Sequence, residues 1–115
     1  MKNMKIYHNP RCAKSRETLA LLKSKGQDPE IVLYLETPPT AQELKAILKK
    51  LRLKPEQLLR KSEAIFKEQY KGKMLSDDQW IKVMLENPKL IERPIVVQGN
   101  KAVLGRPPEN ILEFL

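Results

Sequence analysis

The chain has 115 residues and a formal net charge of +8, from 22 Lys and Arg against 14 Asp and Glu. We expect a single domain over residues 1–115, because this is the length of one compact domain. Hydrophobic residues make up 41% of the chain, which excludes wholesale disorder, and no apolar stretch is long enough to span a bilayer. The first residues lack a secretory signal pattern, so we expect a cytoplasmic protein without membrane attachment.

The positive charge favours an anionic partner or substrate. The chain has no block of five or six basic residues, no aromatic RNA-binding motif and no paired Cys/His spacing, so we expect no specific nucleic-acid partner. Cys12 is the single cysteine and His8 the single histidine. An intramolecular disulfide is therefore excluded, and we expect no metal site.

The chain opens with a predicted strand, helix and strand, over residues 5–7, 13–25 and 30–35. Pro10 ends the first strand, and Gly26 is placed to receive the C-terminus of the helix. The second strand is expected to be buried, because it is rich in aliphatic residues. It should run parallel to the first strand, because a helix intervenes.

The middle of the chain is predicted to be helical. Capping boxes that start at Thr40 and at Ser76 precede two amphipathic patterns. Pro55 can start another helix that runs to Arg60, and a further turn or two is expected over residues 64–70.

An antiparallel hairpin is predicted over residues 95–97 and 102–104, with Gly99 and Asn100 in the turn. A last helix starts near Pro108. The whole order predicts an α/β fold with a mixed four-stranded sheet.

Cys12 is the main candidate for chemistry. It lies between the first strand and the first helix, where unpaired backbone N–H groups and the helix dipole stabilise a thiolate and can bind an oxyanion. Arg11, Lys14 and Arg16 add positive potential, and Ser15 places a hydroxyl on the first turn. These features favour ionisation of the thiol.

Simpler interpretations of the same residues stay open at this point. A lone cysteine is commonly a small buried hydrophobe, and Ser15 can be an ordinary helix N-terminal residue. His8 can be a general base, an orienting hydrogen-bond donor or a polar residue at the loop mouth. Ser15 occupies the position of the resolving cysteine in a Cys-x-x-Cys site, so a second thiol would have to come from another molecule.

Five blocks of sequence, in order and at compatible spacing, resemble the glutaredoxin-coupled arsenate reductase family. They are residues 8–16, 34–40, 58–61, 92–97 and 105–107. The similarity runs almost from end to end. It implies a thioredoxin-like fold with a helical insertion after the second strand, which agrees with the predicted order of elements.

The resemblance implies that Cys12 is the nucleophile that attacks arsenate, with His8 supporting the thiolate and Ser15 beside it. It implies that glutathione is a co-substrate and glutaredoxin the partner that takes up the glutathionyl group, with no bound cofactor. We expect the protein to act as a monomer.

The resemblance also implies that Arg60, Arg93 and Arg106 bind the oxyanion. Guanidinium groups suit this role, because their planar, permanently charged donor forks match several oxygens of a tetrahedral anion. The resemblance further implies a cis peptide bond between Arg93 and Pro94.

Two other functions are compatible with such a fold. The first is a thiol oxidoreductase that acts on another oxyanion or on a glutathionylated protein, although that chemistry does not by itself require three arginines. The second is an adaptor that regulates transcription by binding RNA polymerase. Oxidation-sensing adaptors of this kind use a Cys-x-x-Cys pair, from which Ser15 departs.

Overall fold

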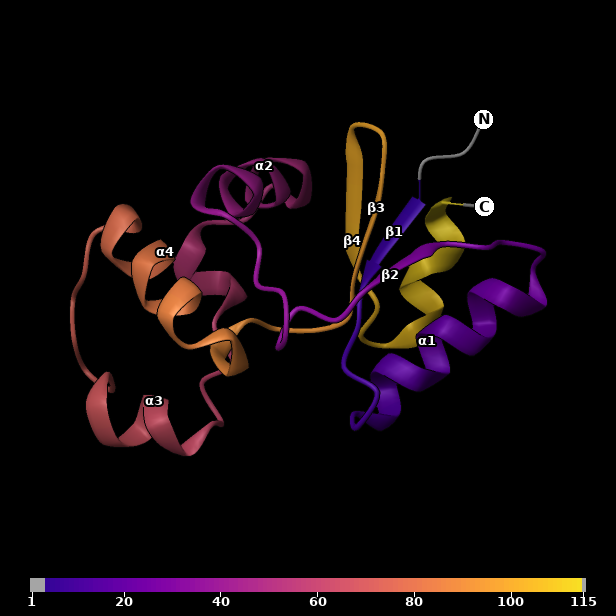
Figure 1. Cartoon of the computed structure of the whole chain (residues 1–115). Coiled ribbons are helices and arrows are strands. Elements are labelled where there is room, and N and C mark those ends of the chain that lie inside the picture. The colour runs from indigo at the N-terminus through magenta and orange to yellow at the C-terminus, as the bar shows by residue number, and fades with distance from the viewer. Residues whose placement is uncertain (1–3, 115) are drawn as a thin grey trace. The chain divides into compact units, whose positions relative to one another are not determined.

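The structure is a computed structural model that describes residues 4–114 (Figure 1). The chain divides into two compact units. The first comprises residues 4–37 and 93–114, and the second comprises residues 38–92. The single domain expected over residues 1–115 stays a prediction.

The first unit contains a four-stranded sheet with the strand order β2-β1-β3-β4. The strands are β1 (Met4–Tyr7), β2 (Glu30–Val32), β3 (Ile95–Gln98) and β4 (Lys101–Leu104). β1 runs parallel to β2 and antiparallel to β3, and β3 pairs antiparallel with β4. The predicted mixed sheet, its parallel first pair and its hairpin are confirmed.

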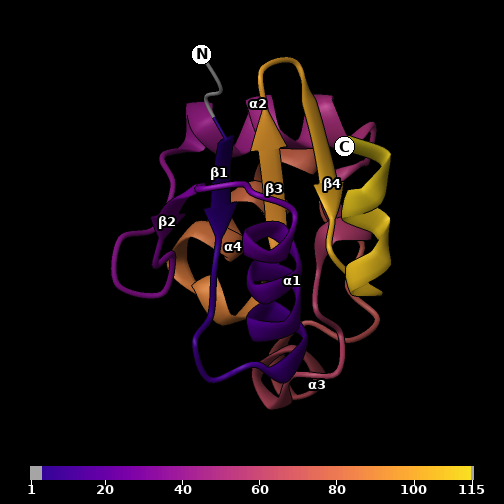
Figure 2. The same cartoon turned by 90° about the vertical axis from the view of Figure 1, so that its right-hand side faces the viewer.

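Helix α1 (Ala13–Ser24) and the 3-10 helix η3 (Pro108–Phe114) lie side by side against the sheet of this unit (Figures 1 and 2). The buried core that they share with the sheet consists of Met4, Ile6, Leu22, Val96 and Ile111. Burial of aliphatic side chains from both layers holds α1 in place. The amino end of α1 is thereby fixed close to the end of β1.

The prediction of a buried strand over residues 30–35 is wrong in two respects. β2 ends at Val32, and it is an edge strand in which Ile31 is 43% exposed. After β2 the chain turns, and the Thr37 N–H donates to the Leu33 carbonyl oxygen at 2.9 Å. The prediction failed because part of the apolar run over residues 31–35 belongs to the turn, where Tyr34 is buried.

The second unit is helical and follows β2 in the chain, which confirms the predicted insertion. Its elements are α2 (Ala41–Leu51), η1 (Pro55–Leu58), α3 (Ala64–Gln69), α4 (Asp77–Glu86) and η2 (Pro88–Leu90). Both predicted capping boxes are present, at Thr40 and at Ser76. Trp80 on α4 is buried and stacks on Phe66 of α3. Within residues 4–114, no helix is long and apolar enough to cross a membrane.

The helix predicted from Pro55 to Arg60 is shorter than expected. It is a 3-10 helix that ends at Leu58, and the chain then becomes extended. Leu59 forms a β-bridge with Ile91, and the Arg60 N–H donates to the Leu90 carbonyl oxygen at 2.7 Å. Pairing with a distant segment, which local sequence does not reveal, thus ends the helix early.

Candidate active site

Cys12 is the N-cap of α1, as its position between the first strand and the first helix predicted. Its N–H donates to the Asn9 carbonyl oxygen at 3.0 Å, and its own carbonyl accepts from the Arg16 N–H at 3.0 Å. The residue is partly buried. The loop therefore holds the sulfur at the positive end of the helix dipole while leaving it accessible.

The surroundings of Cys12 favour the thiolate. Burial raises the pKa of the thiol, but the backbone N–H of Ser15, the charge and hydrogen bond of Arg93, and the backbone N–H of Lys14 outweigh it. The net pKa of Cys12 is lowered.

This shift predicts the pH profile of alkylation. Because the pKa is lowered, a larger fraction of Cys12 is thiolate at neutral pH than in an unfolded chain. The rate of reaction with iodoacetamide should therefore have its midpoint at a lower pH than in the same protein in denaturant. Cys12 is the single cysteine, so the rate reports on one site. A midpoint equal to that of the same protein in denaturant would contradict the assignment.

His8 and Ser15 form a buried hydrogen-bonded pair. His8 Nδ1 lies 2.6 Å from Ser15 Oγ, which also accepts the Asn9 N–H at 3.0 Å. Burial and then the charges of Arg16 and Lys23 lower the pKa of His8, so the imidazole is neutral at pH 7. The direction of this hydrogen bond follows the tautomer of the ring, because a neutral imidazole can either donate or accept at Nδ1.

This pair fixes the loop that precedes Cys12. The His8 N–H donates to the Val32 carbonyl oxygen at 2.9 Å, and Ser15 is fully buried on the first turn of α1. The contact therefore ties the end of β1 to the start of α1. The direct roles of His8 and Ser15 toward the thiolate stay predictions.

Arg93 and Arg106 lie at the same end of the hairpin formed by β3 and β4 in the first unit. Arg93 and Pro94 immediately precede β3, and Gly105 alone separates Arg106 from the end of β4. The Arg93–Pro94 bond is cis, which confirms the expectation. The Arg106–Pro107 bond is also cis, which the sequence had not led us to expect. Arg93 is buried and acts on Cys12, whereas Arg106 is exposed.

Arg60 belongs to the second unit. Its guanidinium donates to a carboxylate oxygen of Glu63, and both side chains are partly exposed. Its membership of an oxyanion-binding set stays a prediction.

Two of the three cations that lie close to Cys12 in sequence have partners of their own. Lys14 pairs with Glu17 at 3.7 Å, and Arg16 donates to the Pro10 carbonyl oxygen at 2.8 Å. The charge of Arg16 acts on His8, and the guanidinium that stabilises the thiolate comes from Arg93. The site thus joins a helix N-terminus to an arginine from the far part of the chain, an arrangement suited to a thiolate nucleophile that meets an oxyanion.

A profile of the ArsC family matches residues 7–114. The chain belongs to the ArsC family. Among curated ArsC relatives, the uncharacterised protein YfgD of Escherichia coli K12 is 53% identical, and the match covers 99% of this chain and 98% of that protein. An arsenate reductase of Haemophilus influenzae is 47% identical, over 96% of this chain and 97% of that protein.

A solved ArsC-family structure agrees with the fold. The arsenate reductase of Vibrio cholerae superposes with a TM-score of 0.94 at 49% identity, and covers 99% of this chain and 98% of that chain. The fold class predicted from the sequence, a thioredoxin-like α/β fold with a mixed four-stranded sheet, is confirmed.

Proposed function

We propose that this chain is an arsenate reductase that uses glutathione and glutaredoxin as thiol donors. The observation that carries the proposal is the pairing of Cys12, at the N-terminus of α1, with the buried guanidinium of Arg93. Membership of the ArsC family and the arsenate reductases among its relatives support the choice of substrate.

In the first step, the Cys12 thiolate attacks the arsenic atom of arsenate. A sulfur–arsenic bond forms, and one oxygen leaves as water after taking up a proton. Arg93, with Arg60 and Arg106 as further members of the proposed set, stabilises the negative charge on the remaining oxygens. The arsenic atom is still pentavalent in the resulting adduct.

In the second step, glutathione replaces another oxygen as water and forms its own sulfur–arsenic bond. Glutaredoxin thiolate then attacks the glutathionyl sulfur, and the electron pair of that sulfur–arsenic bond stays on arsenic. Arsenic is reduced by two electrons, while the two thiols are oxidised to a glutaredoxin–glutathione disulfide. Water finally displaces Cys12 from trivalent arsenic, which releases arsenite and restores the thiol.

A coupled assay with omissions tests the thiol relay. The protein is mixed with arsenate, glutathione, glutaredoxin, glutathione reductase and NADPH, and each component is left out in turn. We expect NADPH oxidation that requires arsenate, glutathione and glutaredoxin together. Oxidation that proceeds with glutathionylated protein but not with arsenate would contradict the proposal and favour a different thiol oxidoreductase. If the protein shows no turnover in this assay but captures RNA polymerase in a separate pull-down, an adaptor function would be favoured.

A further inference from the structure

The segment that carries Arg106 is held by side chains at three successive carbonyl groups. Asn110 Nδ2, from η3, donates to the carbonyl oxygens of Leu104 at 3.1 Å and Arg106 at 3.0 Å. The carbonyl between them, that of Gly105, accepts from Thr18 Oγ1 of α1 at 2.9 Å. Each carbonyl of this irregular segment thus has a side-chain donor, which fixes its path.

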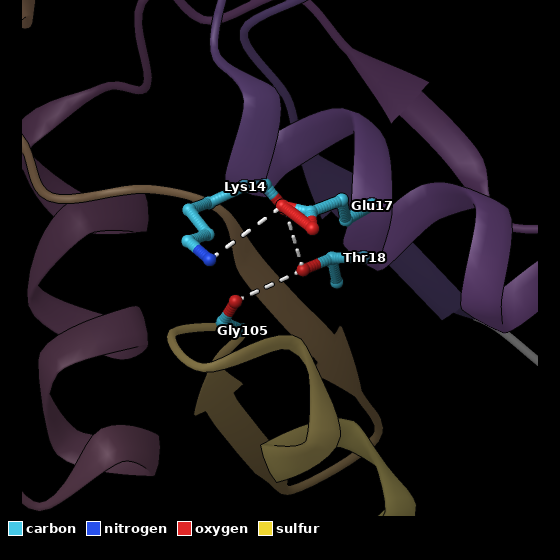
Figure 3. Close-up of polar contacts among 4 residues, drawn as sticks. All are labelled: Lys14, Glu17, Thr18 and Gly105. Atoms are coloured by element: carbon cyan, nitrogen blue, oxygen red, sulfur yellow. Dashed lines mark hydrogen bonds and ion pairs between the residues drawn. The ribbon is translucent and has the colours of Figure 1, made fainter.

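Thr18 reaches this segment from the helix that carries Cys12 at its N-cap (Figure 3). Its side chain is fully buried, and its oxygen also lies 2.9 Å from the Lys14 carbonyl oxygen. A hydroxyl has one proton, so the two carbonyls share it. The first turns of α1 and the Arg106 segment are therefore linked through one buried atom.

Gly105 extends this link to Arg93. Its N–H donates to the Pro94 carbonyl oxygen at 2.9 Å, next to the cis Arg93–Pro94 bond. A Cβ at Gly105 would lie 2.7 Å from Thr18 and 2.9 Å from Pro94, so only glycine allows this close approach without a shift. Two segments that each carry an arginine thus meet at Gly105, which Thr18 connects to α1.

We propose that Thr18 and Asn110 are positioning residues for the reaction: they hold Arg106 and, through Gly105 and Pro94, Arg93 in a fixed relation to Cys12. The inference rests on the proposed function. Packing of α1 and η3 on the sheet is already provided by the apolar core, through residues such as Leu22 and Ile111. The hydrogen bonds of Thr18 and Asn110 then fix the path of the two segments that carry Arg93 and Arg106.

The main test replaces the Thr18 hydroxyl by a methyl group. Thr18→Val keeps the volume and removes the donor, so the Gly105 carbonyl loses its partner. We expect the arsenate KM to rise by about 10- to 100-fold with a smaller change in kcat, as misplacement of a binding group by about 1 Å would cause. The alkylation midpoint of Cys12 should rise by about half a pH unit, because Arg93 is less well placed.

Two matched variants separate positioning from a general loss of stability. Thr18→Ser keeps the hydroxyl, so both readouts should return to the values of the wild-type chain. Ser24→Ala removes another hydroxyl of α1, which donates to the Leu21 carbonyl oxygen at 2.7 Å, and should change neither readout. Wild-type values of KM and alkylation midpoint in folded Thr18→Val would overturn the proposal.

Asn110→Leu provides a second test from the other side of the segment and decides the matter if Thr18→Val does not fold. It removes the side-chain amide that donates to the Leu104 and Arg106 carbonyl oxygens, so a rise in arsenate KM is expected, and a wild-type KM would overturn the proposal. Should the wild-type chain not reduce arsenate, the proposed function fails on its own. The shift of the alkylation midpoint in Thr18→Val then still tests whether Thr18 positions Arg93.

Discussion

Cys12→Ser is expected to abolish arsenate-dependent turnover, down to the rate measured without protein. A serine hydroxyl is far less acidic than the thiol and cannot form the sulfur–arsenic bond on which the reduction depends. Cys12 is the single cysteine, so no other thiol of the chain can replace it. The variant and the wild-type chain are compared in the coupled assay at the same protein concentration.

The position of Cys12 at the N-cap of α1 provides a control for this variant. Serine is a strongly preferred N-cap residue, so Cys12→Ser should keep α1 and the stability of the fold. Loss of activity together with an unchanged thermal unfolding midpoint would assign the effect to the chemistry. Turnover above background in Cys12→Ser would mean that the nucleophile is a different group.

Arg93→Lys is expected to lower kcat/KM for arsenate by about one to two orders of magnitude, mainly through KM. Lysine keeps a positive charge but loses the planar fork that can hold two oxygens at once. Arg93 is only 6% exposed, so a shorter or repositioned cation finds little water to compensate. Arg93→Ala should have a larger effect and should also raise the pKa of Cys12, because both the charge and the hydrogen bond are lost.

Arg52→Lys serves as the matched control. Arg52 is exposed and follows α2 in the second unit, so the same substitution there should leave kcat/KM and the Cys12 pKa unchanged. Full activity in Arg93→Lys would show that a point charge suffices and that forked recognition of the oxyanion by Arg93 is wrong.

The parts of the fold that follow from local chemistry were predictable. The capping boxes at Thr40 and Ser76 are such cases, because each one satisfies its own backbone donors within four residues. The turn at Gly99, which has φ of +58°, is another. The errors at β2 and after Leu58 arise where distant segments or tertiary burial decide the conformation, as for buried Tyr34 and the bridge from Leu59.

In the candidate site, too, some features follow from local sequence and others depend on distant segments. The place of Cys12 at the start of a helix follows from the order of elements, and the structure agrees. The origin of the charge that acts on it does not follow from local sequence. The adjacent cations Lys14 and Arg16 have other partners, and Arg93 reaches the thiol because the sheet brings β3 beside β1. The contact between Arg93 and Cys12 thus depends on the pairing of distant strands, which local sequence does not reveal.

The hydrogen bond between His8 and Ser15 also depends on the fold. Either residue alone permits several interpretations, and only the turn from β1 into α1 brings His8 Nδ1 within 2.6 Å of Ser15 Oγ. The low pKa of His8 follows from burial and from the charges of Arg16 and Lys23. A neutral imidazole at pH 7 suits an orienting role in the loop better than that of a cation beside the thiolate.

Arsenate reduction by Cys12 is tested most directly by measurement of the product, arsenite. Wild-type protein, Cys12→Ser and a sample without protein are incubated with arsenate, glutathione and glutaredoxin, and arsenite is quantified by arsenic speciation. We expect many equivalents of arsenite per wild-type chain and only the background amount from Cys12→Ser. Arsenite formation by the folded wild-type protein at the rate of the sample without protein would show that the chain is not an arsenate reductase.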